Sequence, residues 1–224
     1  MAFVSENRRT LAGLVIVAVA AVASALAAPE LPEQVTTHWN AAGEPDGFMG
    51  ATTVLVGAPA LILGVVVLFE VIPGIDPLGE NVREFQTAYD ALAVLTAGFL
   101  AYTYGFVLAW NLGYQFEVMQ ALAPAMAVLY VAVGYLLERA ERNWFVGIRT
   151  PWTLSSETVW RHTHERAAPL FKLAGVLALG ALVLPDYAVY FLVGPVVAVA
   201  GYATVYSYVD YRRLGDGDVA DAAE

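Results

Sequence analysis

Six long apolar stretches constrain what this chain can fold into. They are approximately Thr10–Ala28, Ala51–Ile72, Ala88–Trp110, Met119–Glu138, Ala167–Leu184 and Asp186–Tyr208. Each is close to the roughly 20 residues that an α-helix needs to cross a bilayer. Hydrophobic residues make up 59% of the chain, against roughly 45–50% in soluble domains. The sequence therefore predicts an all-α, polytopic membrane protein with about six transmembrane helices.

The first apolar stretch allows two interpretations. It follows Arg8 and Arg9 and ends near Ala25-Leu26-Ala27, which is also the plan of a cleaved signal peptide. Its apolar run is longer than the roughly 7–15 residues of a typical signal sequence. A retained helix is therefore favoured, and cleavage would leave the rest of the topology unchanged.

The positive charges predict the orientation of the chain. Arg8 and Arg9 precede the first stretch, Arg212 and Arg213 follow the last, and the connection between the fourth and fifth stretches is rich in arginine. The loop at 29–50 has carboxylates but no lysine or arginine. Since cytoplasmic loops carry the excess of basic residues, both termini are predicted to be cytoplasmic and that loop extracytoplasmic, in a multi-pass plasma membrane protein.

Composition and patterning divide the chain further. We predict an N-terminal membrane half over residues 1–110, a C-terminal membrane half over 111–214, and a disordered Gly/Asp/Ala-rich tail over 215–224. The absence of cysteine excludes disulfides and thiolate metal sites. A net charge of −10 argues against direct nucleic-acid binding and suits a halophilic, high-salt environment in which charges are screened.

The extracytoplasmic loop, LPEQVTTHWNAAGEPDGFMG, is expected to be a compact cap. Asp46-Gly47 is a strong turn signal, and the residues around Thr36 favour a short extended piece. His38 lies among carboxylates, which suggests a metal or proton-responsive site. A single histidine without a spaced partner instead favours a structural role, and we predict no metal site.

The cytoplasmic connection, NWFVGIRTPWTLSSETVWRHTH, is unlike the apolar stretches around it. Ser155 or Ser156 is expected to cap a helix that buries the face formed by Trp160, Thr163 and Ala167. His162 and His164 would point in opposite directions on that helix and could not chelate one ion.

Three ionisable side chains, Glu70, Asp90 and Lys172, lie inside or at the edges of the apolar stretches. Charges buried in a membrane are usually paired, so we predict that Lys172 pairs with Asp90 or Glu70. The alternative is that these side chains extend to the membrane interface. Two roles remain open for Arg149: locking the loop through backbone carbonyls, or binding a lipid phosphate.

Both loops resemble known families. The cytoplasmic connection is similar to the signature of the SdpI-type immunity protein family, and the extracytoplasmic loop resembles a segment of an uncharacterised membrane domain. The matching cytoplasmic positions are Asn143, Gly147, Arg149, Thr150, Pro151, Trp152, Trp160, Thr163 and His164. The matching extracytoplasmic positions are Pro32, His38, Asn40, Gly43, Asp46 and Gly47.

The first resemblance implies an integral membrane protein that is not an enzyme and has no cofactor. Members of that family confer immunity to a secreted membrane-active peptide toxin and sequester a transcriptional repressor at the membrane. The implied partners are thus the lipid bilayer, a peptide toxin and a cytoplasmic repressor. One alternative is a small transporter or channel. Another is a lipid-directed enzyme with Arg149 on phosphate and His164 as base, for which the sequence offers no nucleophile.

Overall fold

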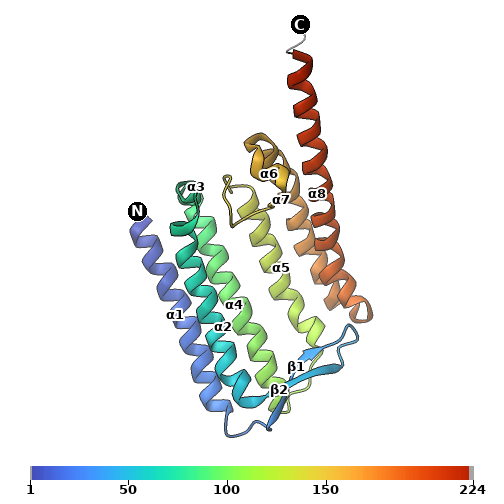
Figure 1. Cartoon of the computed structure of the whole chain (residues 1–224). Helices are drawn as coiled ribbons and strands as arrows, with labels where there is room; N and C mark the ends of the chain where they lie inside the picture. The colour runs from blue at the N-terminus through green and yellow to red at the C-terminus, as the bar shows by residue number, and fades with distance from the viewer. Residues whose placement is uncertain (1, 222–224) are drawn as a thin grey trace.

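The computed structural model describes the backbone of residues 2–221 and the side chains of residues 8–215. It is an elongated helical bundle with both ends of the chain at one end and a β-hairpin at the other (Figure 1). The elements are α1 (Ala2–Ala27), β1 (Gln34–Trp39), β2 (Pro45–Gly50), α2 (Ala51–Ile75), α3 (Gly79–Glu84), α4 (Gln86–Asn111), α5 (Val118–Leu137), α6 (Pro151–Ser155), α7 (Glu157–Ala178), the 3₁₀ turns η1 (Leu179–Leu182) and η2 (Pro185–Tyr187), and α8 (Ala188–Asp221). We call the two ends the terminal end and the hairpin end.

The prediction of an all-α multi-pass membrane protein is confirmed. Five helical segments among the described residues are long and apolar enough to cross a membrane: Arg8–Ala27, Ala51–Ile75, Gln86–Asn111, Val118–Leu137 and Pro185–Gly215. The remaining predicted span falls on the second half of α7 and on η1. Helix α7 differs from the others because its first half is polar, as the sequence ETVWRHTHER indicates. Six spans therefore remain a prediction.

Helix α8 extends further than the sequence suggested. Residues 215–221, for which disorder was expected, continue its helix as far as Asp221, and residues 222–224 lie outside the described part. Each added helical residue contributes a backbone hydrogen bond, and no proline interrupts this segment. The end of α8 projects past the other helices (Figure 1).

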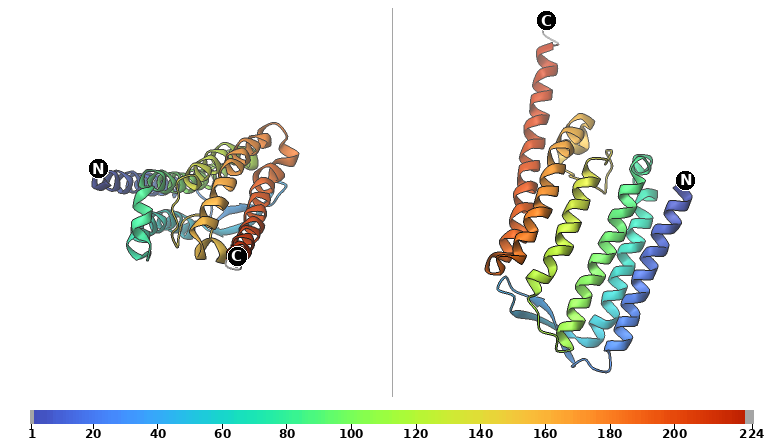
Figure 2. Two further views of the ribbon diagram at one scale, coloured as in Figure 1. Left: turned by 90° about the horizontal axis from the view of Figure 1, so that it is seen from above. Right: turned by 180° about the vertical axis from the view of Figure 1, so that it is seen from behind.

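The long helices pack in two groups of three. Helices α1, α2 and α4 contact one another, α5 and α8 flank α7, and α4 joins the groups by packing on α5. Figure 2 shows this arrangement from above. Small residues let α5 and α7 approach closely, since a Cβ on Gly134 would lie 2.8 Å from the Ala168 carbonyl oxygen and one on Gly175 2.7 Å from that of Ala127.

A second contact between the groups lies at the terminal end. It is a hydrophobic cluster of Ile72, Val82, Phe85, Tyr89, Leu136, Ala140, Val146 and Trp160. These residues come from both groups and from the connection that follows α5. The cluster therefore holds that connection against the bundle.

The extracytoplasmic loop forms the expected compact cap, a two-stranded antiparallel hairpin. Asn111 at the end of α4 fixes it to the bundle, because its amide accepts from the Thr36 N–H at 2.8 Å and donates to the Thr36 carbonyl at 2.9 Å. Asn40 shapes the turn by accepting from the backbone N–H groups of Ala42 and Glu44. Gly43 completes it with φ of +80°, which glycine adopts without strain.

The two ends differ in charge. The arginines belong to segments at the terminal end, namely the starts of α1 and α7, α3, the connection after α5 and the distal part of α8. The described segments at the hairpin end, residues 28–50, 112–117 and 183–187, contain no lysine or arginine. Their carboxylates are Glu30, Glu33, Glu44, Asp46, Glu117 and Asp186. Which end faces the cytoplasm remains a prediction, based on this asymmetry.

Candidate functional site

The connector, residues 138–156, packs on a buried histidine. His164 is 2% exposed, and its ring stacks on Trp160 with centroids 4.1 Å apart. Nδ1 lies 2.8 Å from the Trp160 carbonyl oxygen, and Nε2 lies 3.0 Å from the Ile148 nitrogen. Because a carbonyl can only accept and an amide N–H can only donate, His164 must be neutral with its proton on Nδ1.

Burial reinforces this protonation state. His164 lies outside the predicted spans, and burial lowers its pKa from 6.5 to about 4, while the hydrogen bond to the Trp160 carbonyl acts in the opposite direction. Both ring nitrogens are engaged. The side chain therefore has no free nitrogen with which to act as the base of a lipid-directed enzyme.

Gly147 is fixed by its contact with this ring pair. Its φ is +121°, in a region that side chains other than hydrogen rarely tolerate. A Cβ there would lie 2.6 Å from Nε2 of His164 and 3.0 Å from the Trp160 ring. Glycine is required at this position for both reasons.

Asn143 organises the first half of the connector and is fully buried. Its side-chain oxygen accepts from the N–H groups of Phe145 and Val146, at 3.0 and 2.6 Å. Its side-chain nitrogen donates to the carbonyls of Glu141 and Val146. The amide thus uses both donor hydrogens and its acceptor on the loop backbone, leaving none for a ligand.

Thr150, Pro151 and Trp152 start α6 and attach it to α8. Thr150 and Thr153 form a reciprocal capping box, and Pro151 occupies the first helical position, where its missing N–H is not needed. The Thr150 hydroxyl also bonds that of Ser207 at 3.1 Å. The Trp152 ring lies 5.0 Å from that of Tyr208.

Arg149 is exposed and donates to the Trp144 carbonyl at 2.7 Å. This contact favours the locking role, and phosphate binding is untested. Thr163 is on the buried face of α7 as predicted, and Trp160 and Ala167 lie on the same face. The cap at Ser156 is also as expected, since its hydroxyl accepts from the Val159 N–H.

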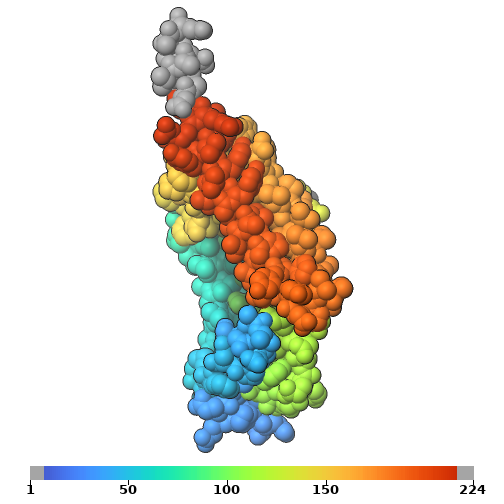
Figure 3. Space-filling model, turned by 90° about the vertical axis from the view of Figure 1, so that its right-hand side faces the viewer, coloured from blue at the N-terminus to red at the C-terminus, as the bar shows by residue number. Residues whose placement is uncertain are grey.

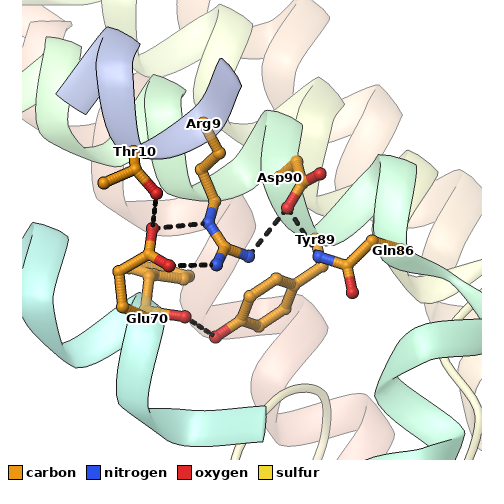
Figure 4. Close-up of polar contacts among 7 residues, drawn as sticks. Arg9, Thr10, Glu70, Gln86, Tyr89 and Asp90 are labelled. Carbon is orange, nitrogen blue, oxygen red and sulfur yellow. Dashed lines mark hydrogen bonds and ion pairs between the residues drawn. The ribbon is translucent and has the colours of Figure 1, made fainter. Parts of the chain in front are cut away.

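The prediction for the intramembrane charges was wrong about the partner of Glu70 and Asp90. Arg9 of α1 reaches both, with Nε and Nη2 bonding the Glu70 carboxylate at 2.9 and 2.6 Å and Nη1 bonding Asp90 at 2.8 Å (Figure 4). The Arg9 side chain is 6% exposed. The Arg9 network therefore ties α1 to α2 and α4.

Neighbouring side chains complete the Arg9 network. Thr10 donates to Glu70 at 2.9 Å, Gln86 donates to Asp90 at 2.7 Å, and the Tyr89 hydroxyl donates to the Phe69 carbonyl at 2.8 Å. The Arg9 guanidinium lies 5.4 Å from the centre of the Tyr89 ring. Figure 4 shows these groups converging from three helices.

Lys172 lies apart from this network. Its ammonium group forms an ion pair with Glu138 and lies 3.9 Å from the centre of the Tyr135 ring. These contacts join α7 to α5. Lys172 fails to reach Glu70 or Asp90 because it belongs to the other three-helix group.

The hairpin exposes its polar groups. His38 Nδ1 contacts Asp46 at 2.5 Å, and their side chains are 71% and 43% exposed. Gly47 faces His38 across the strands, and a Cβ there would lie 2.8 Å from that of His38. Pro32 is exposed ahead of β1. Among the described residues no group of three histidines or carboxylates could hold a metal ion.

A cavity of about 690 Å³ lies beneath the hairpin, between α2, α4 and the start of α5. The hairpin contributes Thr37, His38, Trp39 and Met49, and most of the other lining residues are apolar. Figure 3 faces the hairpin and shows a recess next to it, between α2 and the C-terminal helices. The indole nitrogen of Trp39 is buried without a hydrogen-bond partner.

Known protein families match two regions of the chain, one that contains most of the connector and one that contains the hairpin. The SdpI/YfhL protein family matches residues 139–207, which run from the connector through α7 into α8. The immunity protein SdpI of Bacillus subtilis (strain 168) is 21% identical over 208 residues, covering 92% of this chain and 98% of that protein. The chain is therefore similar to the SdpI-type family over its C-terminal region and to one immunity protein over nearly its whole length.

The N-terminal half of the chain also matches a family model. Residues 15–63 match a domain of unknown function, DUF1648, and this range contains the hairpin and much of α1 and α2. No solved structure matches the chain. The similarity to the SdpI-type family and the apolar helices together identify a multi-pass membrane protein.

Several residues that shape this structure were not singled out from the sequence. Arg9 was considered only as a topology signal, although its position directly before an apolar run could have suggested a partner for Glu70 and Asp90. Asn111 and Ser207 lie among apolar residues without a motif. Trp39 lies in the cavity wall, a position for which the sequence contains no signal.

Proposed function

We propose that this protein is a non-enzymatic immunity protein that protects the membrane of its own cell against a secreted membrane-active peptide. The observation that carries the proposal is the extent of the similarity to the immunity protein from Bacillus subtilis, which covers nearly all of both chains. The similarity therefore spans the hairpin, the connector and the helices that hold them.

The arrangement of the connector supports a role without catalysis. The motif residues Asn143, Gly147, Thr150 and His164 use their polar atoms or their small size to hold the connector in one conformation. A catalytic site would instead need unengaged groups facing a substrate. The resemblance also suggests a signalling role, in which the terminal end holds a transcriptional repressor at the membrane.

A transporter or channel is the alternative. Such proteins place polar substrate sites near the middle of the membrane. The Arg9 network instead lies within two turns of the terminal ends of α1 and α4, and the cavity walls are mainly apolar. These features favour binding of an apolar partner over transfer of ions.

The experiment is deletion of the gene followed by challenge with culture supernatants of related strains that contain membrane-active peptides. We expect the deletion strain to become more sensitive to at least one supernatant and complementation to restore resistance. A variant with Asn143→Leu, which removes the connector's central amide, should fail to complement. Unchanged sensitivity of the deletion strain to every supernatant would contradict immunity.

A further inference from the structure

The cavity beneath the hairpin has a wall suited to apolar side chains. Val54, Ala58, Leu61 and Ile62 from α2 and Leu122 from α5 line it. Its volume of about 690 Å³ lies within the roughly 300–1,000 Å³ range of ligand sites. The cavity can therefore accept several apolar side chains of a partner.

Trp39 also contributes to this wall. The indole N–H of Trp39 is buried without a protein partner, and Trp39 lines the cavity. Because this nitrogen is inaccessible, the ring contributes apolar surface to the cavity wall. Trp39 is held in place by an edge-on contact with Trp110, at a centroid distance of 5.5 Å.

The surroundings of the cavity are acidic. Glu117 directly precedes Val118 and Met119, which line the cavity, and Asp46 bonds the lining residue His38. Glu44 lies at the end of the hairpin turn, two residues before Asp46. The described segments of the hairpin end have no lysine or arginine to neutralise these carboxylates. A partner with basic side chains beside an apolar face would complement both properties.

We infer that the cavity beneath the hairpin binds the apolar face of a cationic amphipathic peptide, whose basic side chains contact the surrounding carboxylates. This inference rests on the proposed function, which makes the partner a membrane-active peptide. On the predicted topology the hairpin end is extracytoplasmic, so the cavity faces the side from which a secreted peptide arrives. Binding there would hold the peptide's apolar face away from the lipid.

The chain contains no cysteine, which allows a direct occupancy test in full-length protein in phosphatidylcholine nanodiscs. Thr53 lines the cavity and Thr52 does not, and both are exposed. The probe is a synthetic amphipathic peptide of leucine and lysine, with a leucine and glutamate peptide as the control. We expect the lysine peptide to slow alkylation of Thr53→Cys roughly tenfold and to leave Thr52→Cys unchanged. The glutamate peptide should protect neither thiol.

A matched pair of glycines on α2 tests whether the cavity volume is needed. Gly57 lines the cavity and Gly64 does not, and a Cβ at either position would meet nothing within 4 Å. Gly57→Leu should weaken binding of the lysine peptide roughly tenfold, which matches the loss of about one buried leucine-sized contact. Gly64→Leu should leave binding within about twofold and serves as the control for folding.

A second pair tests the surrounding charge. Glu117→Gln should weaken binding about two- to threefold, as expected for an exposed ion pair. Glu84→Gln removes the same charge from the terminal end and should have no effect. The effect of Glu117→Gln should shrink at high salt because exposed charges are screened.

Other outcomes separate the inference from the proposed function. If Thr53→Cys is alkylated more slowly than Thr52→Cys without peptide, and adding peptide does not change its rate, the occupant would be a lipid acyl chain. This result would overturn the inference. Equal protection by both peptides, or unchanged binding in Gly57→Leu, would also overturn it. If the wild-type gene and Gly57→Leu restore resistance equally, the inference fails and the immunity proposal stands. If the deletion strain is as resistant as the wild type, the immunity proposal fails whatever the nanodisc result.

Discussion

The connector at the terminal end and the hairpin at the other end use their polar groups in different ways. Asn143 in the connector and His164 in the adjoining α7 are buried, and backbone groups satisfy the amide of Asn143 and both ring nitrogens of His164. In the hairpin, His38 and Asp46 are exposed and bond each other, and the indole nitrogen of Trp39 has no partner. A motif in which the amide of Asn143 and both ring nitrogens of His164 are engaged internally serves the fold, whereas exposed charge beside a cavity leaves capacity for a partner.

The largest effect is expected where a charge at the terminal end is buried. Arg9→Leu would leave Glu70 and Asp90 without their shared cation and should lower the free energy of unfolding by about 3–5 kcal/mol. Thermal unfolding in detergent measures this change. Lys172→Met is the control, because its partner Glu138 is 39% exposed, and its effect should be below about 1 kcal/mol. Equal effects of the two variants would show that the Arg9 network is not buried as described.

Gly147 in the connector and Gly43 in the hairpin both have positive φ, so the same substitution can be compared at the two ends. Gly147→Ala should lower the free energy of unfolding by about 3 kcal/mol, because it combines backbone strain with overlap on His164. Gly43→Ala in the hairpin turn meets nothing within 4 Å and should cost only about 1 kcal/mol of backbone strain. If Gly43→Ala lowered the free energy of unfolding as much as Gly147→Ala, the expected difference between the hairpin and the connector would be contradicted.

The stability of the protein should also depend on pH through His164, the residue on which the connector packs. The pKa of His164 is about 4 in the folded protein, below its ordinary value of 6.5, so the unfolded chain binds the proton first as pH falls. The free energy of unfolding should therefore decrease between about pH 6.5 and pH 4, by about 2–3 kcal/mol in total, and this contribution should be constant above pH 6.5. Unfolding measured across this range in wild type and His164→Leu checks it. The variant should lose this part of the pH dependence.

The smallest effect on stability is expected in the hairpin. Asp46→Asn removes the charge that contacts His38, and both side chains are largely exposed. Its effect on the free energy of unfolding should be below about 1 kcal/mol. Thermal unfolding measures it beside the connector variants. If Asp46→Asn lowered the free energy of unfolding as much as Gly147→Ala, the polar groups of the hairpin would also serve mainly to stabilise the fold.

Local patterns predicted the parts of this structure that depend on local physics. Hydropathy located the membrane helices because a chain in lipid must satisfy its own backbone hydrogen bonds. The Ser156 cap and the buried face of Trp160 and Thr163 followed from short-range spacing. The extended piece expected around Thr36 lies in β1, but Asp46-Gly47, predicted as a turn, lies in β2, and the chain turns instead at residues 40–44.

Features set by packing between distant segments could not be predicted in the same way. The pairing of Arg9 with Glu70 and Asp90 depends on how far α1 slides and turns against α2 and α4. The protonation of His164 depends on an N–H donor at Ile148, sixteen residues earlier. The cavity exists because of how the two three-helix groups and the hairpin meet, which no single segment encodes.

The terminal-end hydrophobic cluster, which includes Phe85, Leu136 and Trp160, fixes the point about which the two halves could turn. Helix α4 has 26 residues and is about 39 Å long. A tilt of about 5° at the clustered end would displace the opposite end of such a helix by roughly 3 Å. If the two groups turned about this cluster, the largest displacement would therefore be at the hairpin end, where the cavity lies.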